Sequence, residues 1–179
     1  AALDAAGIEY CGYQNLFVFE MDGHAIGFGG CRETEFLQNK AIVYRDIQKL
    51  KKMGCDVIVY SCHWGVEYDA AHNGTQERMA RYAVNSGADI VVGTHPHVVQ
   101  GIADMDGCAV LYSLGNLVFG GTHELSTFDA VLVRATMRFD DDGTYLGVVL
   151  NLVPVLTSGS APENDFRPVP ATGKDASRI

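Results

Sequence analysis

The sequence predicts an α/β protein built on a parallel sheet. Two short apolar runs, residues 57–61 and 90–92, are typical of buried strands. An amphipathic segment with helical spacing precedes each run, which indicates β-α-β order and right-handed crossovers. Both runs lead into histidine-containing loops, and open parallel sheets bind ligands beyond the carboxyl ends of their strands. We therefore expect a functional site at that edge of the sheet.

Turn and cap residues divide the chain into successive elements. In chain order we expect the final turns of a helix over residues 1–7, hairpin strands over 17–20 and 24–28, helices over 41–53 and 75–86, and strands over 57–61, 90–92, 109–113, 117–119, 130–139 and 145–153. Asp-Gly sequences at residues 22–23 and 142–143 predict tight hairpin turns. Thr75 is the expected N-cap of the second long helix.

The pattern of elements separates residues 1–155 from residues 156–179. The chain from Pro154 onward holds four of the five prolines and has no periodic apolar pattern, so we expect a surface arm or loose tail there. At the other end, the helical pattern begins without a cap, which predicts that the chain is the carboxyl-terminal portion of a longer protein. Strands missing from such a portion would leave open edges and favour self-association.

Composition excludes several classes of protein. The 179 residues carry 13 Lys and Arg against 22 Asp and Glu, a net charge of −9, and we see no Lys/Arg stripe. Nucleic acid is therefore not an expected partner. The five cysteines form no Cys-x-x-Cys pair, which argues against a disulfide framework and a zinc ribbon. No apolar run approaches the roughly 18 residues that a membrane-spanning helix needs.

Three histidines follow the two central predicted strands. His63 lies just past the first strand, and His95 and His97 flank Pro96 just beyond the second. Proline fixes its own φ and disfavours a helical predecessor, so we expect an extended, stiff loop that presents both imidazoles. Imidazole nitrogens suit zinc, iron, manganese and nickel. The pattern predicts that His63, His95 and His97 are metal ligands in one crevice.

Other polar residues lie near the expected mouth of this crevice. Glu67, four residues after His63, is a candidate metal ligand, a partner for an imidazole N–H, or an acid that protonates a leaving group. Asn116 follows a predicted strand in a polar turn and is a candidate contact for phosphate or a metal-bound water. We further expect Trp64 to be a crevice wall or core, His24 to be exposed and inert, and His72 and His123 to lie in loops near the mouth.

The chain resembles a known bacterial family at successive motifs. These motifs are His63-Trp-Gly-Val-Glu67-Tyr68, Gln76, Gly87-Ala-Asp89-Ile-Val-Val-Gly93-Thr-His95-Pro-His97-Val98-Val-Gln100 and Tyr112-Ser-Leu-Gly-Asn116-Leu-Val-Phe119. They are similar to the motifs of the bacterial capsule-synthesis CapA family, the poly-gamma-glutamate biosynthesis (PGA_cap) group of the calcineurin-like metallophosphoesterase superfamily. The resemblance covers residues 1–155, and Leu117 stands where that family usually has Phe.

The resemblance implies part of a four-layer α/β/β/α sandwich with a two-metal centre. It implies that His63 and His95 bind one metal and His97 the other, while Glu67 and Asn116 position or protonate. The family's remaining ligands belong to an amino-terminal half that these residues do not include. We therefore expect two divalent ions (Mn, Fe or Zn) in the intact protein and weak or absent binding by this chain, because a catalytic zinc site typically has three protein ligands.

Two functions are consistent with this resemblance. The first is a capsule or poly-gamma-glutamate biosynthesis protein with a metal-dependent hydrolase or transferase site that acts on an anionic polymer or a phosphoester. The alternative is a non-catalytic, membrane-anchored scaffold or export component that binds the polymer, because a fold does not establish a reaction. The resemblance also implies a location at the extracytoplasmic face of the cell envelope, with any membrane anchor in a segment outside this chain.

Overall fold

The larger of two β-sheets carries the candidate site. The computed structural model describes residues 2–179, and this sheet has the strand order β1-β2-β3-β4-β6-β5. Its strands are β1 (Phe17–Met21), β2 (His24–Arg32), β3 (Val57–His63), β4 (Ile90–Thr94), β5 (Ile102–Met105) and β6 (Cys108–Leu111). Strands β2, β3, β4 and β6 are parallel, whereas β1 and β5 pair antiparallel at the two edges. The predicted parallel sheet is confirmed.

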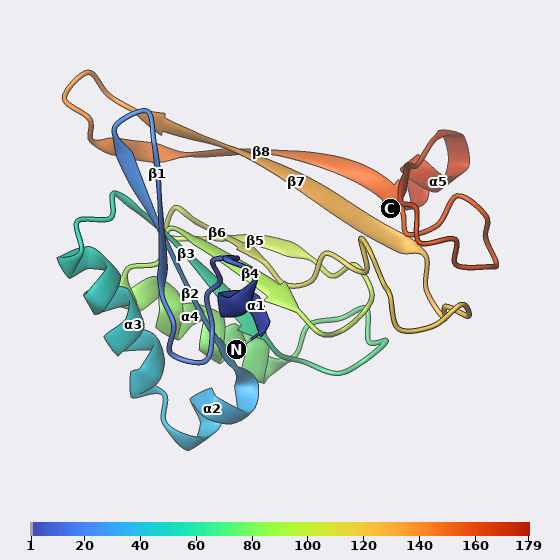
Figure 1. The fold of residues 1–179 in the computed structure, drawn as a ribbon, viewed down its shortest axis with the longest axis horizontal. Helices are drawn as coiled ribbons and strands as arrows, with labels where there is room; N and C mark the ends of the chain where they lie inside the picture. The colour runs from blue at the N-terminus through green and yellow to red at the C-terminus, as the bar shows by residue number, and fades with distance from the viewer. Residues whose placement is uncertain (1) are drawn as a thin grey trace.

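Helices cover one face of this sheet (Figure 1). They are α2 (Glu33–Gln38), α3 (Ala41–Lys52) and α4 (Gly74–Ser86), and α1 (Ala2–Ala5) forms a short turn near the start of the chain. The two long helices bury apolar stripes against β2, β3 and β4, and the core there includes the fully buried Val43, Ile47 and Leu50 of α3. Gly7, with φ +66°, ends the first turn as expected.

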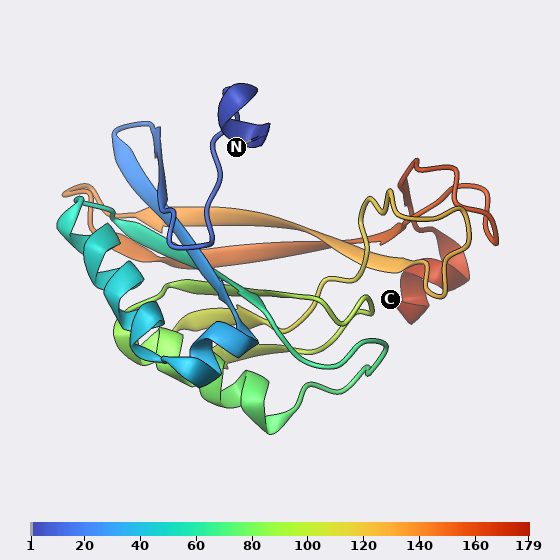
Figure 2. The same cartoon turned by 60° about the horizontal axis from the view of Figure 1, so that its bottom comes forward.

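A long β-hairpin lies over the other face (Figure 2). It consists of β7 (Asp129–Phe139) and β8 (Tyr145–Leu156), and β9 (Val169–Pro170) pairs with the end of β8. Helices, first sheet and second sheet form three layers, which confirms the predicted α/β class. The second helical layer of the expected four-layer sandwich is not among residues 2–179.

The segment after residue 155 is not a loose tail. It forms β9 and α5 (Gly173–Arg178), and it buries Thr157, Ser158 and Asn164. Its Ser, Thr and Asn side chains donate hydrogen bonds to backbone carbonyls, and Asp165 accepts one from a backbone N–H, a type of order that leaves no apolar period in the sequence. Residues 156–179 therefore pack against the rest of the structure through these contacts.

Three other expectations were wrong for identifiable reasons. Strand β2 continues past residue 28 to Arg32, because its glycines weaken the strand signal yet allow close pairing with β3. The N-cap of α4 is Asn73 instead of Thr75, since the Asn73 Oδ1 accepts hydrogen bonds from the backbone of Thr75 and Gln76. Residues 117–119 form no strand and instead belong to a loop that the final segment supports.

Two predictions from composition hold for the described residues. None of the five cysteines is disulfide-bonded, and Cys31, Cys62 and Cys108 are buried among apolar side chains. Within residues 2–179, no helix has both the length and the apolar character that a membrane crossing requires.

Candidate metal centre

The three predicted histidines meet at the carboxyl ends of β3 and β4. His63 is the last residue of β3 and pairs in register with Thr94, the last residue of β4, so His95 follows immediately beside it. The ring centroids of His63 and His95 are 4.5 Å apart, and those of His95 and His97 are 6.0 Å apart. Parallel pairing of two strands therefore brings together residues that are 32 positions apart in sequence.

A carboxylate completes a group of possible metal ligands. Glu67, His95 and His97 each offer one ligand atom, and these three atoms all lie within 4.8 Å of one another. Glu67 is exposed and both imidazoles are half-buried, so the group opens to solvent. The sequence left three roles open for Glu67, and its place in this group favours that of a ligand.

The loop that carries the two imidazoles is not extended as expected. His95 has φ +102° and His97 has φ +60°, values that side-chain-bearing residues rarely adopt. Hydrogen bonds from neighbouring segments hold this conformation: the Tyr68 backbone N–H donates to the Pro96 carbonyl at 2.8 Å, and Thr127 Oγ1 donates to the His97 carbonyl at 2.6 Å. Strained backbone of this kind persists where surrounding contacts impose it and is frequent at functional sites.

Asn116 fixes the orientation of one imidazole. Its Oδ1 lies 2.8 Å from Nδ1 of His97, so a protonated Nδ1 donates to the amide oxygen and Nε2 is left with its lone pair free. An imidazole with one nitrogen held in this way is the usual arrangement of a metal-ligating histidine. Asn116 therefore acts through His97 in this structure.

The segment after residue 155 supports the loop between β6 and β7 that carries Asn116, called the Asn116 loop below. Thr157 Oγ1 donates to the Asn116 carbonyl, and the Asn164 side-chain amide donates to the carbonyls of Phe119 and Thr122 at 2.7 and 2.8 Å. Sequence reasoning missed these supports because they join residues about 40 positions apart and follow no motif.

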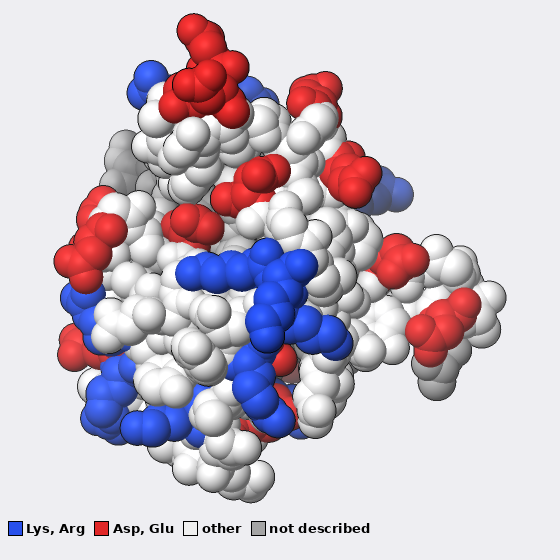
Figure 3. All heavy atoms as spheres, turned by 90° about the vertical axis from the view of Figure 1, so that its left-hand side faces the viewer, with Lys and Arg blue, Asp and Glu red and all other residues white. Residues whose placement is uncertain are grey.

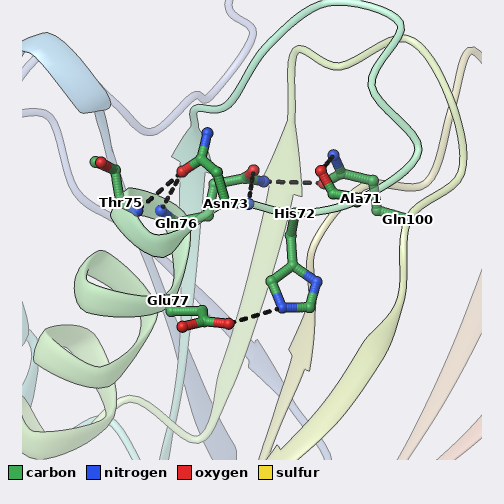
Figure 4. Close-up of polar contacts among 7 residues, drawn as sticks. All are labelled: Ala71, His72, Asn73, Thr75, Gln76, Glu77 and Gln100. Carbon is green, nitrogen blue, oxygen red and sulfur yellow. Dashed lines mark hydrogen bonds and ion pairs between the residues drawn. The ribbon is translucent and has the colours of Figure 1, made fainter.

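Two buried amides fix the loop that carries Glu67 (Figure 4). Gln76 is fully buried, its Oε1 accepts from the Asn73 backbone, and its Nε2 donates to Oε1 of Gln100 at 2.9 Å. Gln100 in turn donates to the carbonyls of Asp69 and Ala71, at 2.8 and 3.3 Å. The two glutamines thereby tie α4 and the segment after β4 to the loop between β3 and α4. Their positions within the motifs were noted from sequence, but this positioning role was not.

Close packing below the site requires a residue without a side chain at position 93. A Cβ on Gly93 would lie 2.0 Å from the Tyr112 carbonyl oxygen and 2.4 Å from Nε1 of Trp64. The Trp64 indole is buried and donates to that same carbonyl at 2.8 Å. Trp64 is thus part of the core beneath the histidines, one of the two alternatives expected for it.

The other histidines lie apart from this group. His72 stacks on Tyr112 with centroids 3.7 Å apart and contacts Glu77 at 3.2 Å. His123 packs against Phe166 in the loop supported by the final segment. His24 is not exposed and inert as expected, because its ring stacks on Phe139 at 3.6 Å and joins the first hairpin to the second sheet.

Burial lowers the pKa of His63, and the nearby His95 and Arg32 lower it further. A lowered pKa favours the neutral imidazole, which is the form that binds a metal ion. The donors present, two or three imidazoles and a carboxylate, match the ligand sets of zinc and of other divalent transition metals.

Fold and site together define an α/β protein with a histidine-rich candidate metal centre at the carboxyl ends of parallel strands. The sequence profile described as "Bacterial capsule synthesis protein PGA_cap" matches residues 1–121. The chain belongs to this family.

Two curated relatives support the same assignment. The chain is 38% identical over 130 residues to a protein of Bacillus anthracis named "Capsule biosynthesis protein CapA", an alignment that covers 70% of this chain and 30% of the relative. It is 41% identical over 96 residues to the "PGA biosynthesis protein CapA" of Bacillus subtilis, which covers 52% of this chain and 24% of the relative. Each alignment therefore spans less than a third of the relative's length.

Proposed function

We propose that this protein acts in capsule or poly-gamma-glutamate biosynthesis and contributes a metal-dependent hydrolase or transferase site. Family membership and the names of the two relatives support the biosynthetic role. The observation that supports the site is the convergence of Glu67, His95 and His97, with possible ligand atoms within 4.8 Å of one another. The substrate class that we propose is an anionic polymer or a phosphoester.

The residues present fit a divalent cation. Glu67, His95 and His97 would hold it, and His63, with its ring 4.5 Å from that of His95, lies beside them as a further donor. The grouping differs from the expectation that His63 and His95 share one ion and His97 binds another. Three donors in one group match the number typical of a catalytic zinc site, so the fit is better than the histidines alone predicted. We propose Mn, Fe or Zn as the ion.

A divalent ion at this place supplies Lewis-acid polarisation of a phosphoryl or acyl group and activates water. The chain's own residues set the geometry. Asn116 holds His97 in the tautomer whose Nε2 can ligate. Gln76 and Gln100 fix the loop on which Glu67 stands. The carboxylate is thereby brought to the imidazoles by the scaffold and does not depend on the ion for its approach.

The His95→Ala variant tests this proposal. We expect it to lose most bound metal, measured by plasma mass spectrometry after incubation with Mn, Fe or Zn, together with any phosphodiesterase activity. His24→Ala, at the amino-terminal end of β2 and therefore at the opposite edge of the sheet, is the matched control and should keep the metal content of the wild type. Wild-type metal content and activity in His95→Ala would contradict the proposal.

A specific surface favours the non-catalytic alternative. Helix α3 carries four exposed basic residues in a chain of net charge −9, Arg45, Lys49, Lys51 and Lys52. Lys and Arg side chains gather on the end of the molecule where this helix lies (Figure 3). The expectation that the chain has no Lys/Arg stripe was therefore wrong for α3. Salt-sensitive binding of poly-gamma-glutamate without hydrolysis of phosphoester or amide would favour a scaffold that binds anionic polymer.

A further inference from the structure

A basic side chain beside the histidines, Arg32, is not itself one of the candidate metal ligands. Arg32 is the last residue of β2 and the register partner of His63 at the end of β3. Arg32 and His63 line a pocket of about 210 Å³ together with Tyr13 and Cys31, and they also line a second hollow that extends to His95. Arg32 therefore borders both hollows, as His63 does.

Arg32 forms no ion pair with a carboxylate within residues 2–179, although Glu35 lines the same pocket and Glu33 the second hollow. The two nearest acidic residues in the sequence are committed to backbone groups: Glu33 accepts from the Gly65 N–H, and Glu35 accepts from the backbone N–H of Arg32 itself, both at 2.8 Å. None of the ion pairs formed by the described residues includes Arg32. The Arg32 guanidinium thus has no ion-pair partner among the described residues of a chain whose net charge is −9.

Tyr13 holds the Arg32 guanidinium in place. The guanidinium carbon lies 4.7 Å from the centroid of the Tyr13 ring, and Nη2 donates to the Tyr13 hydroxyl. Both contacts are with an uncharged group, and they use one of the five N–H donors of arginine. Stacking on an aromatic face fixes the plane of the guanidinium, which reduces the side-chain entropy lost when it binds an anion.

We propose that Arg32 binds an oxyanion of the substrate, a phosphate or a carboxylate group, beside the three histidines. A guanidinium binds both anions through paired N–H donors. The proposal rests on the proposed function, because it assigns the substrate recognition of that same site. It adds that Arg32, and not only a bound metal ion, recognises one negative charge of the substrate. The register of β2 and β3 brings Arg32 to that position.

The test uses metal-free protein, prepared with a chelator, so that no metal ion can hold the anion. Inorganic phosphate and γ-glutamylglutamate are titrated separately, and dissociation constants are taken from the NMR shifts of the Gly65 and His63 backbone amides. We expect Arg32→Gln to weaken binding of at least one anion about tenfold or more, because charge-assisted hydrogen bonds are lost. The anion affinity of Arg32→Lys should lie between those of the wild type and Arg32→Gln, because lysine keeps the positive charge but lacks the planar guanidinium.

Arg134→Gln is the matched control. Arg134 is exposed on β7 in the other sheet, and its replacement changes the net charge by the same amount. We expect anion binding in this variant to match the wild type. Unchanged affinity for both anions in Arg32→Gln, an equal loss in Arg134→Gln, or no binding of either anion by the wild type would overturn the proposal. Thermal unfolding of each variant verifies that the exposed substitutions leave the fold intact.

The two anions and the metal assay give separate answers. Whichever anion depends on Arg32 identifies the oxyanion as phosphate or carboxylate. A chain that binds no metal yet needs Arg32 for anion binding would contradict the metal centre and leave the oxyanion site standing. A chain whose metal content depends on His95 but whose anion binding ignores Arg32 would keep the proposed function and overturn this inference.

Discussion

The first sheet and the β7–β8 hairpin are both well-ordered sheets, yet only the first has a continuous buried core. In β3, the exposed fractions of Val57, Ile58 and Tyr60 are 2% or less. In the hairpin, Leu132, Val149 and Leu152 are 42–48% exposed. The backbone ladder of the hairpin is nevertheless unbroken over most of its length. Regular hydrogen bonding alone therefore does not indicate where the free energy of folding resides.

One end of the hairpin contacts the Asn116 loop beside the candidate metal centre. Its buried residues, Ala130, Val131 and Val155, lie at the end next to the site. There the Val131 N–H donates to the Leu114 carbonyl at 2.9 Å, and Ala130 forms a β-bridge with Gly115. The near end of the hairpin therefore supports the Asn116 loop, whereas its far end extends beyond the core.

A pair of identical substitutions should show the largest difference between the two regions. Leu50→Ala removes a fully buried side chain beneath the first sheet and should lower the free energy of unfolding by about 2–5 kcal/mol. Leu152→Ala, at a position that is 48% exposed, should cost less than about 1 kcal/mol. Urea unfolding of both variants measures the difference. Equal losses of unfolding free energy in the two variants would contradict the difference in burial between the first sheet and the hairpin.

The buried hydrogen bonds of Gln76 should affect metal binding as well as stability. Gln76→Ala leaves the Gln100 Oε1 and the Asn73 N–H without their buried partner, which should cost about 1–3 kcal/mol and weaken metal binding about tenfold through the Glu67 loop. Metal titration and urea unfolding measure the two effects. Asp140→Ala is the control, because its Oδ1 accepts two backbone hydrogen bonds in an exposed turn at the far end of the hairpin. Weakened metal binding in Asp140→Ala would contradict the view that the far end of the hairpin has no effect on the candidate metal centre.

The smallest effect is expected from Tyr145→Phe, for which Tyr60→Phe is the comparison. The buried Tyr60 hydroxyl donates to Asp46 Oδ2 at 3.0 Å, so Tyr60→Phe leaves a buried carboxyl group unpaired and should cost about 1–3 kcal/mol. The buried Tyr145 hydroxyl has no hydrogen-bond partner among the described residues, and burial raises its pKa to about 12. Tyr145→Phe should therefore change stability by no more than about 0.5 kcal/mol or increase it slightly. Differential scanning calorimetry at neutral pH compares them, and a large loss in Tyr145→Phe would argue against an unsatisfied hydroxyl.

Elements with strong local patterns were predictable. The helix over 41–53, the two central strands and both hairpin turns follow from apolar periodicity and Asp-Gly sequences, and the structure has each within a few residues. The proximity of His63 to His95 followed from the topology of parallel sheets. Strand β5 and helix α2 were missed because each is short and has no clear period.

The finer features of the site depend on tertiary contacts. The loop in which His95 and His97 have positive φ values accepts hydrogen bonds from Tyr68 and Thr127, and no local sequence pattern reveals these contacts. Arg32 was missed because β2 was expected to end at residue 28, four positions before it. The apolar run that continues through residues 29–31 was the available signal, and glycine at two of these positions concealed it.

The supports that Thr157 and Asn164 give to the Asn116 loop have a consequence for the order of events during synthesis. A ribosome delivers all candidate ligands by residue 97, but these supports lie about 60 positions later in the chain. A nascent chain that has already released its histidines therefore does not yet present the finished centre. The part of the site that contains Asn116 is therefore completed only after residues 157–164 have emerged and folded back onto it.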